Sequence, residues 1–257
     1  MPLKPGKRPM KHTLKVVAGI AAFASTTTVG GAWWYATSTP SPTQLALSSP
    51  LVDVRSAEGK ALLDGTRFRV DYDTLARYFV SQSRRAYCGV ASATIVVNAL
   101  HPVAPLVTQR TFFTAEASSV RSAWQVTVAG MTLDDLAGLL RAHDLTVSVV
   151  HASESDLASF RASARASLMD TSDFLLVNYD RATLHQQGSG HISPVVAYNV
   201  ETDRFLVLDV ASYKYPPTWV PAGDLWNAMN TVDTSSGNSR GFLFVQASGR
   251  AARSQAG

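Results

Sequence analysis

The sequence predicts an α+β fold, in which a helical first half carries the one cysteine of the chain and a largely antiparallel sheet carries a histidine and an aspartate. Helix signals dominate between residues 88 and 169, where apolar residues recur at helical spacing behind capping residues. Strand signals dominate from residue 174 onward, where short apolar runs are separated by turn sequences. A chain of 257 residues with 46% hydrophobic residues is long enough to bury one full core.

Residues 1–36 are predicted to form an export signal or a membrane anchor. A basic start precedes an uncharged, mostly apolar run from Val16 to Tyr35, which is the charge order of an exported segment. The small residues of Ala22–Ala24 are consistent with signal cleavage, whereas the length of the run and the aromatic residues Trp33–Tyr35 favour an uncleaved anchor. We expect the anchor, and on either interpretation the rest of the chain is periplasmic or otherwise extracytoplasmic.

The segment 37–48 is predicted to be an extended linker, because prolines and small polar residues follow one another in Ser38–Thr43. One folded domain is expected over residues 49–247, followed by a polar tail at 248–257.

Three helices stand out within this domain. The first is apolar along its whole length, starting at Cys88 and ending near Leu100. Thr132–Asp135 is a capping-box variant that opens the second helix, and Ser153–Asp156 repeats the pattern for a third helix that runs to about Met169.

The strands are predicted at residues 145–151, 174–179, 192–198, 204–210 and 241–245. The turn Glu201–Arg204 makes an antiparallel hairpin of the third and fourth of them. A short helix is expected after Pro221.

Cys88 is the first candidate for chemistry. A thiol at a helix N-terminus lies near unpaired backbone N–H groups and the positive end of the helix dipole, and both favour the thiolate. Without a second cysteine it cannot close an intramolecular disulfide or contribute to a Cys-rich metal site. The alternative is a small buried apolar residue, which a free cysteine often is.

A base and its partner follow in the second half. The predicted hairpin would bring Asp209 beside His191, which begins the first strand of the hairpin. Thiolate, imidazole and carboxylate in the order Cys, His, Asp match the arrangement of papain-like enzymes. His185 is the rival base, but strand pairing suggests no carboxylate partner for it. Gln82 precedes Cys88 and could aim its amide at the oxyanion that forms when a thiolate attacks a carbonyl.

Composition excludes other classes of function. The net charge of +4 comes largely from the basic N-terminus, so no nucleic-acid partner is predicted. The sequence contains no glycine-rich phosphate loop and no cluster of metal ligands, so neither a nucleotide cofactor nor structural zinc is expected.

Several segments resemble the catalytic domain of phytochelatin synthases. They cover residues 82–100, 178–181, 188–194, 208–221 and 225–229, and the most specific is Tyr-Lys-Tyr-Pro-Pro-Thr-Trp-Val-Pro at 213–221. The resemblance runs from about Ser49 to Val245 and implies a papain-like fold. It also implies glutathione as the substrate: in this family the cysteine attacks the carbonyl that joins Cys to Gly, releases glycine, and passes the γ-Glu-Cys acyl group to another glutathione or to water.

The resemblance also assigns roles. It makes Cys88 the nucleophile, His191 the base, Asp209 the residue that orients the base, and Gln82 the oxyanion donor. The γ-glutamyl end of the substrate carries an ammonium and a carboxylate, which need opposite charges for recognition. The residues at matching positions are Arg181 and Arg240 for the carboxylate, Asp233 for the ammonium, and Asn178 and Tyr215 in the pocket lining.

No resident cofactor or metal is implied, and heavy-metal ions such as cadmium are expected as metal-thiolate substrates or as activators. The expected partners are glutathione and other γ-glutamyl peptides, the membrane for the N-terminal segment, and a second copy of the chain in a homodimer.

Two departures from the eukaryotic pattern favour hydrolysis. Ser212 stands where Arg usually precedes the aromatic-Lys-Tyr string, which weakens the site expected for the acceptor glutathione. The sequence also lacks the Cys-rich C-terminal extension of eukaryotic members. We therefore expect hydrolysis to γ-Glu-Cys and glycine as the main reaction and phytochelatin synthesis as the minor one.

Two other functions stay open. A papain-like endopeptidase or amidase would share Cys88, His191 and Asp209 without needing Asp233 and Arg240. A membrane-tethered binding module would leave the cysteine as ordinary packing.

Overall fold

The computed structural model describes residues 1, 31 and 33–249, and the chain divides into two compact units at Ser38. The first unit contributes a short helical stretch at residues 33–37. Most of the apolar run from Val16 to Tyr35, and the polar tail from residue 250 onward, lie outside the described residues. None of the helices within the described ranges combines the length and the hydropathy that crossing a membrane requires.

The second unit is built on one antiparallel sheet, which has seven strands in the described part of the chain. Their order across the sheet is β1-β6-β5-β4-β3-β7-β2. The strands are β1 (Val52–Asp53), β2 (Leu145–His151), β3 (Asp173–Asp180), β4 (Gly190–Asn199), β5 (Arg204–Val207), β6 (Thr218–Pro221) and β7 (Gly241–Ala247). Because β3 and β4 are paired on both edges, the residues at their ends are held on a rigid support.

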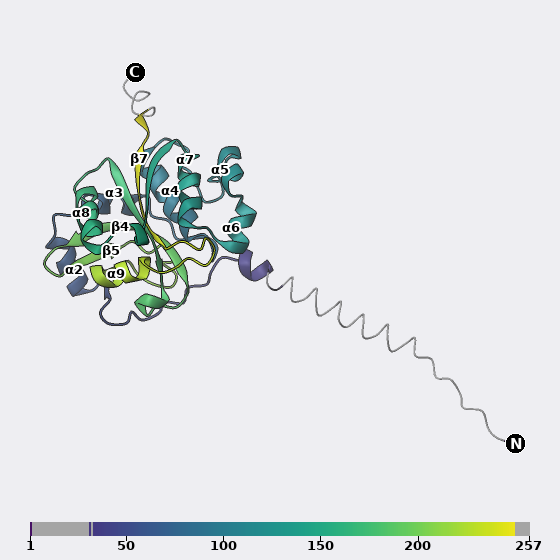
Figure 1. Cartoon of the computed structure of the whole chain (residues 1–257), viewed down its shortest axis with the longest axis horizontal. Coiled ribbons are helices and arrows are strands. Elements are labelled where there is room, and N and C mark those ends of the chain that lie inside the picture. Colours follow the sequence, from purple (N-terminus) through teal and green to yellow (C-terminus); the bar gives the residue numbers. More distant parts are fainter. Residues whose placement is uncertain (2–30, 32, 250–257) are drawn as a thin grey trace. The chain divides into compact units, whose positions relative to one another are not determined.

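Helices cover both faces of this sheet (Figure 1). One core cluster joins the sheet to α2 (Ala57–Asp64), α3 (Val70–Arg77), α4 (Cys88–Leu100), α5 (Ala115–Val120), α6 (Ala123–Ala129) and α7 (Leu133–Arg141). The other cluster joins it to α8 (Leu157–Ser167) and α9 (Ala222–Met229). Two short 3₁₀ turns, η1 (Ala152–Glu154) and η2 (Ala182–Leu184), follow β2 and β3. The predicted α+β class is confirmed.

The helix that carries the cysteine has the predicted bounds, Cys88–Leu100. Gly89 through Asn98 are all buried, as expected for a helix that is apolar on every side. The capping box that opens α7 is also confirmed, because the side chains of Thr132 and Asp135 each accept a hydrogen bond from the other residue's backbone. By contrast, α8 is capped by Asp156 alone, since the residues from Ala152 to Glu154 form η1 instead.

The predicted hairpin is present, but its second strand ends early. β4 and β5 pair from Asn199 opposite Arg204 to Val195 opposite Val207, with a register shift on the way. Pro194 has no N–H group to donate, so it accepts from Leu208 without returning a hydrogen bond, and the regular ladder stops. Asp209 therefore lies in the segment just after β5 and not within a strand.

The segment before the domain has no regular secondary structure between residues 39 and 48. It is nevertheless held against the rest of the second unit, because backbone N–H groups of Thr43, Gln44 and Leu45 donate to the carbonyls of Tyr213 and Lys214.

Asp71 is a buried acid in the first turn of α3. It is 0% exposed, and neither of its carboxylate oxygens has a hydrogen-bond partner in the described structure. Burial, together with the charges of Asp173 and Asp170, raises the pKa of this carboxyl to about 8. The core therefore holds a neutral carboxylic acid at neutral pH, and ionising it would strand a charge there.

Asp71→Asn should remove a pH dependence from the stability of the fold. A carboxyl whose pKa is raised in the folded chain contributes most below its ordinary value of 3.8, and that contribution is lost as the pH rises towards 8. In that window the free energy of unfolding of the unmodified chain should fall by up to about 1.4 kcal/mol per pH unit relative to Asp71→Asn. Urea unfolding at a series of pH values measures this difference.

The matched control is Asp73→Asn, which changes an exposed acid in the same helical turn. The free energy of unfolding of Asp73→Asn, plotted against pH, should run parallel to that of the unmodified chain. A parallel curve for Asp71→Asn as well would mean that Asp71 is not held in its neutral form.

Candidate active site

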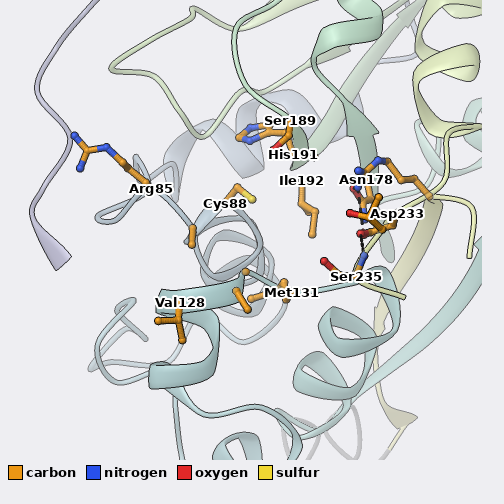
Figure 2. A pocket seen from close by; sticks show the side chains of 16 residues that line it. Arg85, Cys88, Val128, Met131, Asn178, Ser189, His191, Ile192, Asp233 and Ser235 are labelled. Atoms are coloured by element: carbon orange, nitrogen blue, oxygen red, sulfur yellow. Dashed lines mark hydrogen bonds and ion pairs between the residues drawn. The ribbon is translucent and has the colours of Figure 1, made fainter. Parts of the chain in front are cut away.

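A cavity of about 390 Å³ lies between the N-terminus of α4 and the ends of β3, β4 and β7. Figure 2 shows Cys88 with His191 on one side and Met131 on the other, while Asn178 and Asp233 lie further along the cavity. Arg240 lines the same end. Five of the nine predicted site residues therefore share this cavity, although they come from widely separated parts of the sequence.

Cys88 is the first residue of α4 and is partly exposed. No side chain caps this helix start, so its backbone N–H groups are available to a nearby anion. Burial alone would raise the pKa of Cys88, but a hydrogen bond from His191, the charge of His191, and the N–H groups of Ile192 and Gly89 hold it below its ordinary value. The site favours a thiolate, which is the nucleophilic form of cysteine.

His191 is buried near the start of β4, and its Nε2 atom lies 3.0 Å from Oδ1 of Asp209. An ionised carboxylate only accepts hydrogen bonds, so Nε2 carries the proton in this contact. That leaves Nδ1 for the hydrogen bond with Cys88. The predicted juxtaposition of cysteine, histidine and aspartate is present in the structure.

Asp209 is 1% exposed, and burial by itself would favour its neutral form. The charges of Arg181 and His191 outweigh that effect and hold the pKa of Asp209 well below its usual range. Nη2 of Arg181 donates to both carboxylate oxygens at 2.8 Å, and the Ala211 N–H donates to Oδ1 at 2.8 Å. The carboxylate is thus fixed both in charge and in direction.

This ion pair corrects the expectation for Arg181. The residue does not line the cavity, where a substrate carboxylate was expected to meet it, because its guanidinium is buried against Asp209. Tyr215 also lies outside the cavity lining: its ring is 5.2 Å from the guanidinium carbon of Arg181, and its hydroxyl accepts from the N–H of Gln187. Arg181 therefore supports Asp209 directly, and Tyr215 lies against the guanidinium of Arg181.

Gln82 also differs from expectation. Its Nε2 donates to the backbone carbonyls of Arg84 and Arg85 at 2.9 and 2.8 Å, so both amide protons are used within the turn before α4. The side chain is 4% exposed and does not line the cavity, and its Oε1 has no hydrogen-bond partner in the described structure. The amide therefore holds the turn that leads to Cys88.

The far end of the cavity carries one positive and one negative charge. Nη1 of Arg240 lies 3.2 Å from Oδ2 of Asp233 and 3.3 Å from Oδ1 of Asn178. A side chain at Gly190 would collide with this arginine, since its Cβ would lie 2.5 Å from Nη1. Glycine at this position therefore makes room for the guanidinium, and the paired charges suit a group that carries both an ammonium and a carboxylate.

Sequence reasoning missed two residues of the site. Met131 packs its sulfur against Gly89 beside the cysteine, and no sequence pattern marks it as a wall of the cavity. Ser193 places its hydroxyl 3.0 Å from Nε2 of His191. Its position two residues after His191 on one strand could have indicated this contact, because alternate residues share a face.

The rival base is separate from this site. His185 is exposed in the turn after η2, with a positive φ of 55°, and does not line the cavity. Within the part of the chain that the structure describes, no group of three or more His, Cys, Asp or Glu side chains is arranged to hold a metal ion.

Comparison with known proteins matches these features to one family. Residues 42–242 match the family model of phytochelatin synthase. The chain is 36% identical over 207 residues to glutathione gamma-glutamylcysteinyltransferase 3 of Lotus japonicus, covering 77% of this chain and 43% of that protein. It is 36% identical over 206 residues to the enzyme of Triticum aestivum named glutathione gamma-glutamylcysteinyltransferase 1, covering 77% and 41%. It is 34% identical over 220 residues to the Arabidopsis thaliana protein of that name, covering 82% and 43%.

The chain thus spans less than half the length of the curated relatives it matches. The matched part includes the cavity and every predicted site residue. The chain therefore belongs to the phytochelatin synthase family.

Proposed function

We propose that this chain is a papain-like thiol enzyme that cleaves the Cys–Gly amide of glutathione and transfers the γ-Glu-Cys acyl group, mainly to water. The observation that carries the proposal is the cavity itself. It has a thiolate with its histidine at one end and an arginine–aspartate pair at the other. A generic peptidase needs the first end but not the second.

The reaction would begin with attack of the Cys88 thiolate on the carbonyl carbon between the cysteine and glycine of glutathione. The backbone N–H of Cys88, which as the first helical residue has no partner within α4, would stabilise the oxyanion. Gln82 would add a second donor only after releasing one of the two carbonyls that it now bonds. Protonated His191 would then give its Nδ1 proton to the leaving amine, and free glycine and a γ-Glu-Cys thioester would form.

The second half of the reaction would reverse these roles. Neutral His191 would take a proton from water, whose oxygen attacks the thioester, so that γ-Glu-Cys leaves and the thiolate returns. Attack by the α-amine of a second glutathione would instead give a longer γ-glutamyl peptide. Asp209 would hold the imidazole in the same tautomer through both halves of the reaction, because its ionised carboxylate can only accept a hydrogen bond from Nε2.

Recognition would take place at the far end of the cavity. Arg240 would bind the α-carboxylate of the γ-glutamyl group, Asp233 its ammonium, and Asn178 would bond either group. Without substrate these two charges neutralise each other, so little reorganisation precedes binding. Ser193 and Arg181 would not contact the substrate. Ser193 would contact the imidazole directly, and Arg181 would act on it through Asp209.

The balance between water and an acceptor would depend on the loop after β5. Ser212 is a short neutral residue there, and its carbonyl is engaged by the side chain of Gln44. The neighbouring Lys214 donates to the carbonyl of Gln187. With few free cations in this loop, a second glutathione would bind weakly and water would usually accept the acyl group.

Metals would enter with the substrate. We propose that a heavy-metal ion such as cadmium reaches the enzyme as a glutathione thiolate complex or acts as an activator, and that no resident metal is needed for the thiolate chemistry. The N-terminal segment would keep the enzyme outside the cytoplasm, either anchored or after cleavage, and a homodimer is the assembly proposed.

The function is tested by mixing the full chain, kept under reductant, with glutathione and measuring free glycine and γ-Glu-Cys over time. Glycine should be released by the unmodified chain and not by Cys88→Ser, because a serine hydroxyl is not ionised near neutral pH. Cleavage of unrelated peptides without glycine release from glutathione would favour the endopeptidase alternative. No turnover of either substrate would favour the binding module.

Arg240→Ala should lower kcat/KM for glutathione by an amount equal to a loss of roughly 2 to 4 kcal/mol in transition-state stabilisation, because it leaves the substrate carboxylate without its guanidinium partner in a partly desolvated site. Turnover of p-nitrophenyl acetate, which lacks a γ-glutamyl end, should hardly change. Parallel rates of glycine and nitrophenol release measure this selectivity.

Arg161→Ala is the matched control, since it removes an arginine that is paired with Asp203 away from the cavity. Arg161→Ala should keep the same ratio of glycine release to nitrophenol release as the unmodified chain. Equal loss on both substrates for Arg240→Ala would assign that arginine a structural role.

Ser212→Arg should raise the ratio of transfer to hydrolysis, because a cation in the loop after β5 would help bind the carboxylates of an acceptor glutathione. The products in the presence of cadmium, separated by mass spectrometry, give the ratio of (γ-Glu-Cys)n-Gly chains to γ-Glu-Cys. Ser159→Arg adds the same charge on α8 and should leave the ratio unchanged. Long chains as the main early product of the unmodified protein would contradict the hydrolase proposal.

A further inference from the structure

A buried hydroxyl shares the imidazole of His191 with Asp209. Oγ of Ser193 lies 3.0 Å from Nε2 of His191 and accepts a hydrogen bond from the N–H of Val210 at 3.3 Å. Ser193 is 0% exposed, so no solvent can replace these contacts. The contact follows from the fold, because the two residues alternate along β4 and the segment after β5 passes beside them.

The directions of these hydrogen bonds are fixed by the partners. Asp209 is ionised and only accepts, so the Nε2 proton points at Asp209 and at the Ser193 oxygen together. The Val210 N–H occupies the second lone pair of that oxygen. The hydroxyl proton must then point elsewhere, and the neighbouring phenol of Tyr179 can accept it.

The groups around the imidazole come from α4, from β3 and the residue after it, and from the segment after β5. Cys88 faces it from α4, and Tyr179 faces it from β3, with ring centroids 5.6 Å apart at an interplanar angle of 78°. Asp209 faces it from the segment after β5, and Arg181 lies behind that carboxylate. Burial raises the pKa of Tyr179 far above its ordinary value, although the charge of Arg181 opposes the shift. The phenol therefore stays neutral and can accept from Ser193.

We propose that Ser193 is a positioning residue that, together with Asp209, holds His191 as the Nε2–H tautomer with Nδ1 directed at Cys88. Asp209 alone gives the Nε2 proton one acceptor, and the ring can still swing about that single contact. The hydroxyl gives the same proton a second acceptor from another direction, and this acceptor is tied to the backbone through Val210. The inference deepens the proposed function and rests on it only for the rates with glutathione.

The test uses Ser193→Ala in the full chain and two readouts. Alkylation of Cys88 by iodoacetamide across a pH series reports the thiolate directly, since the chain has a single cysteine. The midpoint of this curve should move to higher pH in Ser193→Ala, because a mobile imidazolium stabilises the thiolate less. The value of kcat for glycine release should fall on the order of 10-fold to 100-fold with KM nearly unchanged, as expected when a reacting group is misplaced.

Ser92→Ala is the matched control. This serine is equally buried, and its hydroxyl donates to the backbone of Ile192 without touching the imidazole. It should lower the free energy of unfolding while leaving the alkylation midpoint in place. Ser193→Thr keeps the hydroxyl, so its alkylation midpoint should stay close to that of the unmodified chain.

An unchanged alkylation curve in folded Ser193→Ala would overturn the proposal. A shift of the same size in Ser92→Ala would also overturn it, because the effect would then come from packing. A shifted curve in a chain that releases no glycine from glutathione would support the positioning role and refute the proposed substrate.

A second measurement needs no variant at position 193. In Cys88→Ser, ¹⁵N NMR of the histidines should show the neutral form of His191 with its proton on Nε2. A lone pair on Nε2 would mean that Ser193 donates to the ring, and it would overturn the proposal even if Ser193→Ala failed to fold.

Discussion

The buried ion pair between Arg181 and Asp209 is the interaction on which the site depends. It joins three parts of the chain: the residue after β3, the segment after β5, and, through His191, the start of β4. An unpaired carboxylate at this depth would be strongly disfavoured, and removing one partner of a buried pair costs about 3 to 5 kcal/mol. Because the Arg181 guanidinium offsets this cost, Asp209 can stay ionised while fully buried and can accept a hydrogen bond from the imidazole.

This pairing has a chemical consequence for the cysteine. Because ionised Asp209 can only accept a hydrogen bond, Nε2 of His191 must carry a proton. Nδ1 is then the ring nitrogen that faces Cys88, and a proton on Nδ1 favours the thiolate. The same strands carry the recognition end, since β3 bears Asn178 and Arg240 precedes β7. Because these strands pair with each other, the distance from the imidazole of His191 to the charged end is fixed by the sheet. A substrate would be selected by length as well as by charge.

Much of this arrangement could be predicted from local signals. The bounds of α4 and β2 and the capping box of α7 follow from apolar spacing and capping residues. The approach of His191 and Asp209 follows from the hairpin, although the missing N–H of Pro194 ends β5 early. Helices such as α2 and α3, and the short strand β6 in the Trp-Val-Pro string, were not predicted. They are short, and their stability comes from the sheet and not from their own sequence pattern.

The predictions for charged residues were the least reliable, for a physical reason. The sequence shows that an arginine is present but not which carboxylate it reaches, so Arg181 was expected to meet a substrate and instead meets Asp209. Gln82 was expected to aim its amide at the oxyanion, yet nearby carbonyls occupy that amide. Asp233 and Arg240 were expected in the pocket and do line the cavity. Long-range partners of this kind are fixed only by the assembled sheet.

The most direct test of the account is the intact mass of the unmodified chain, quenched with acid shortly after mixing with glutathione. The account predicts an added mass of one γ-Glu-Cys acyl group, located on the peptide that contains Cys88 and removed by hydroxylamine. Glycine release without such an adduct at any time, or the same adduct on Cys88→Ser, would contradict it.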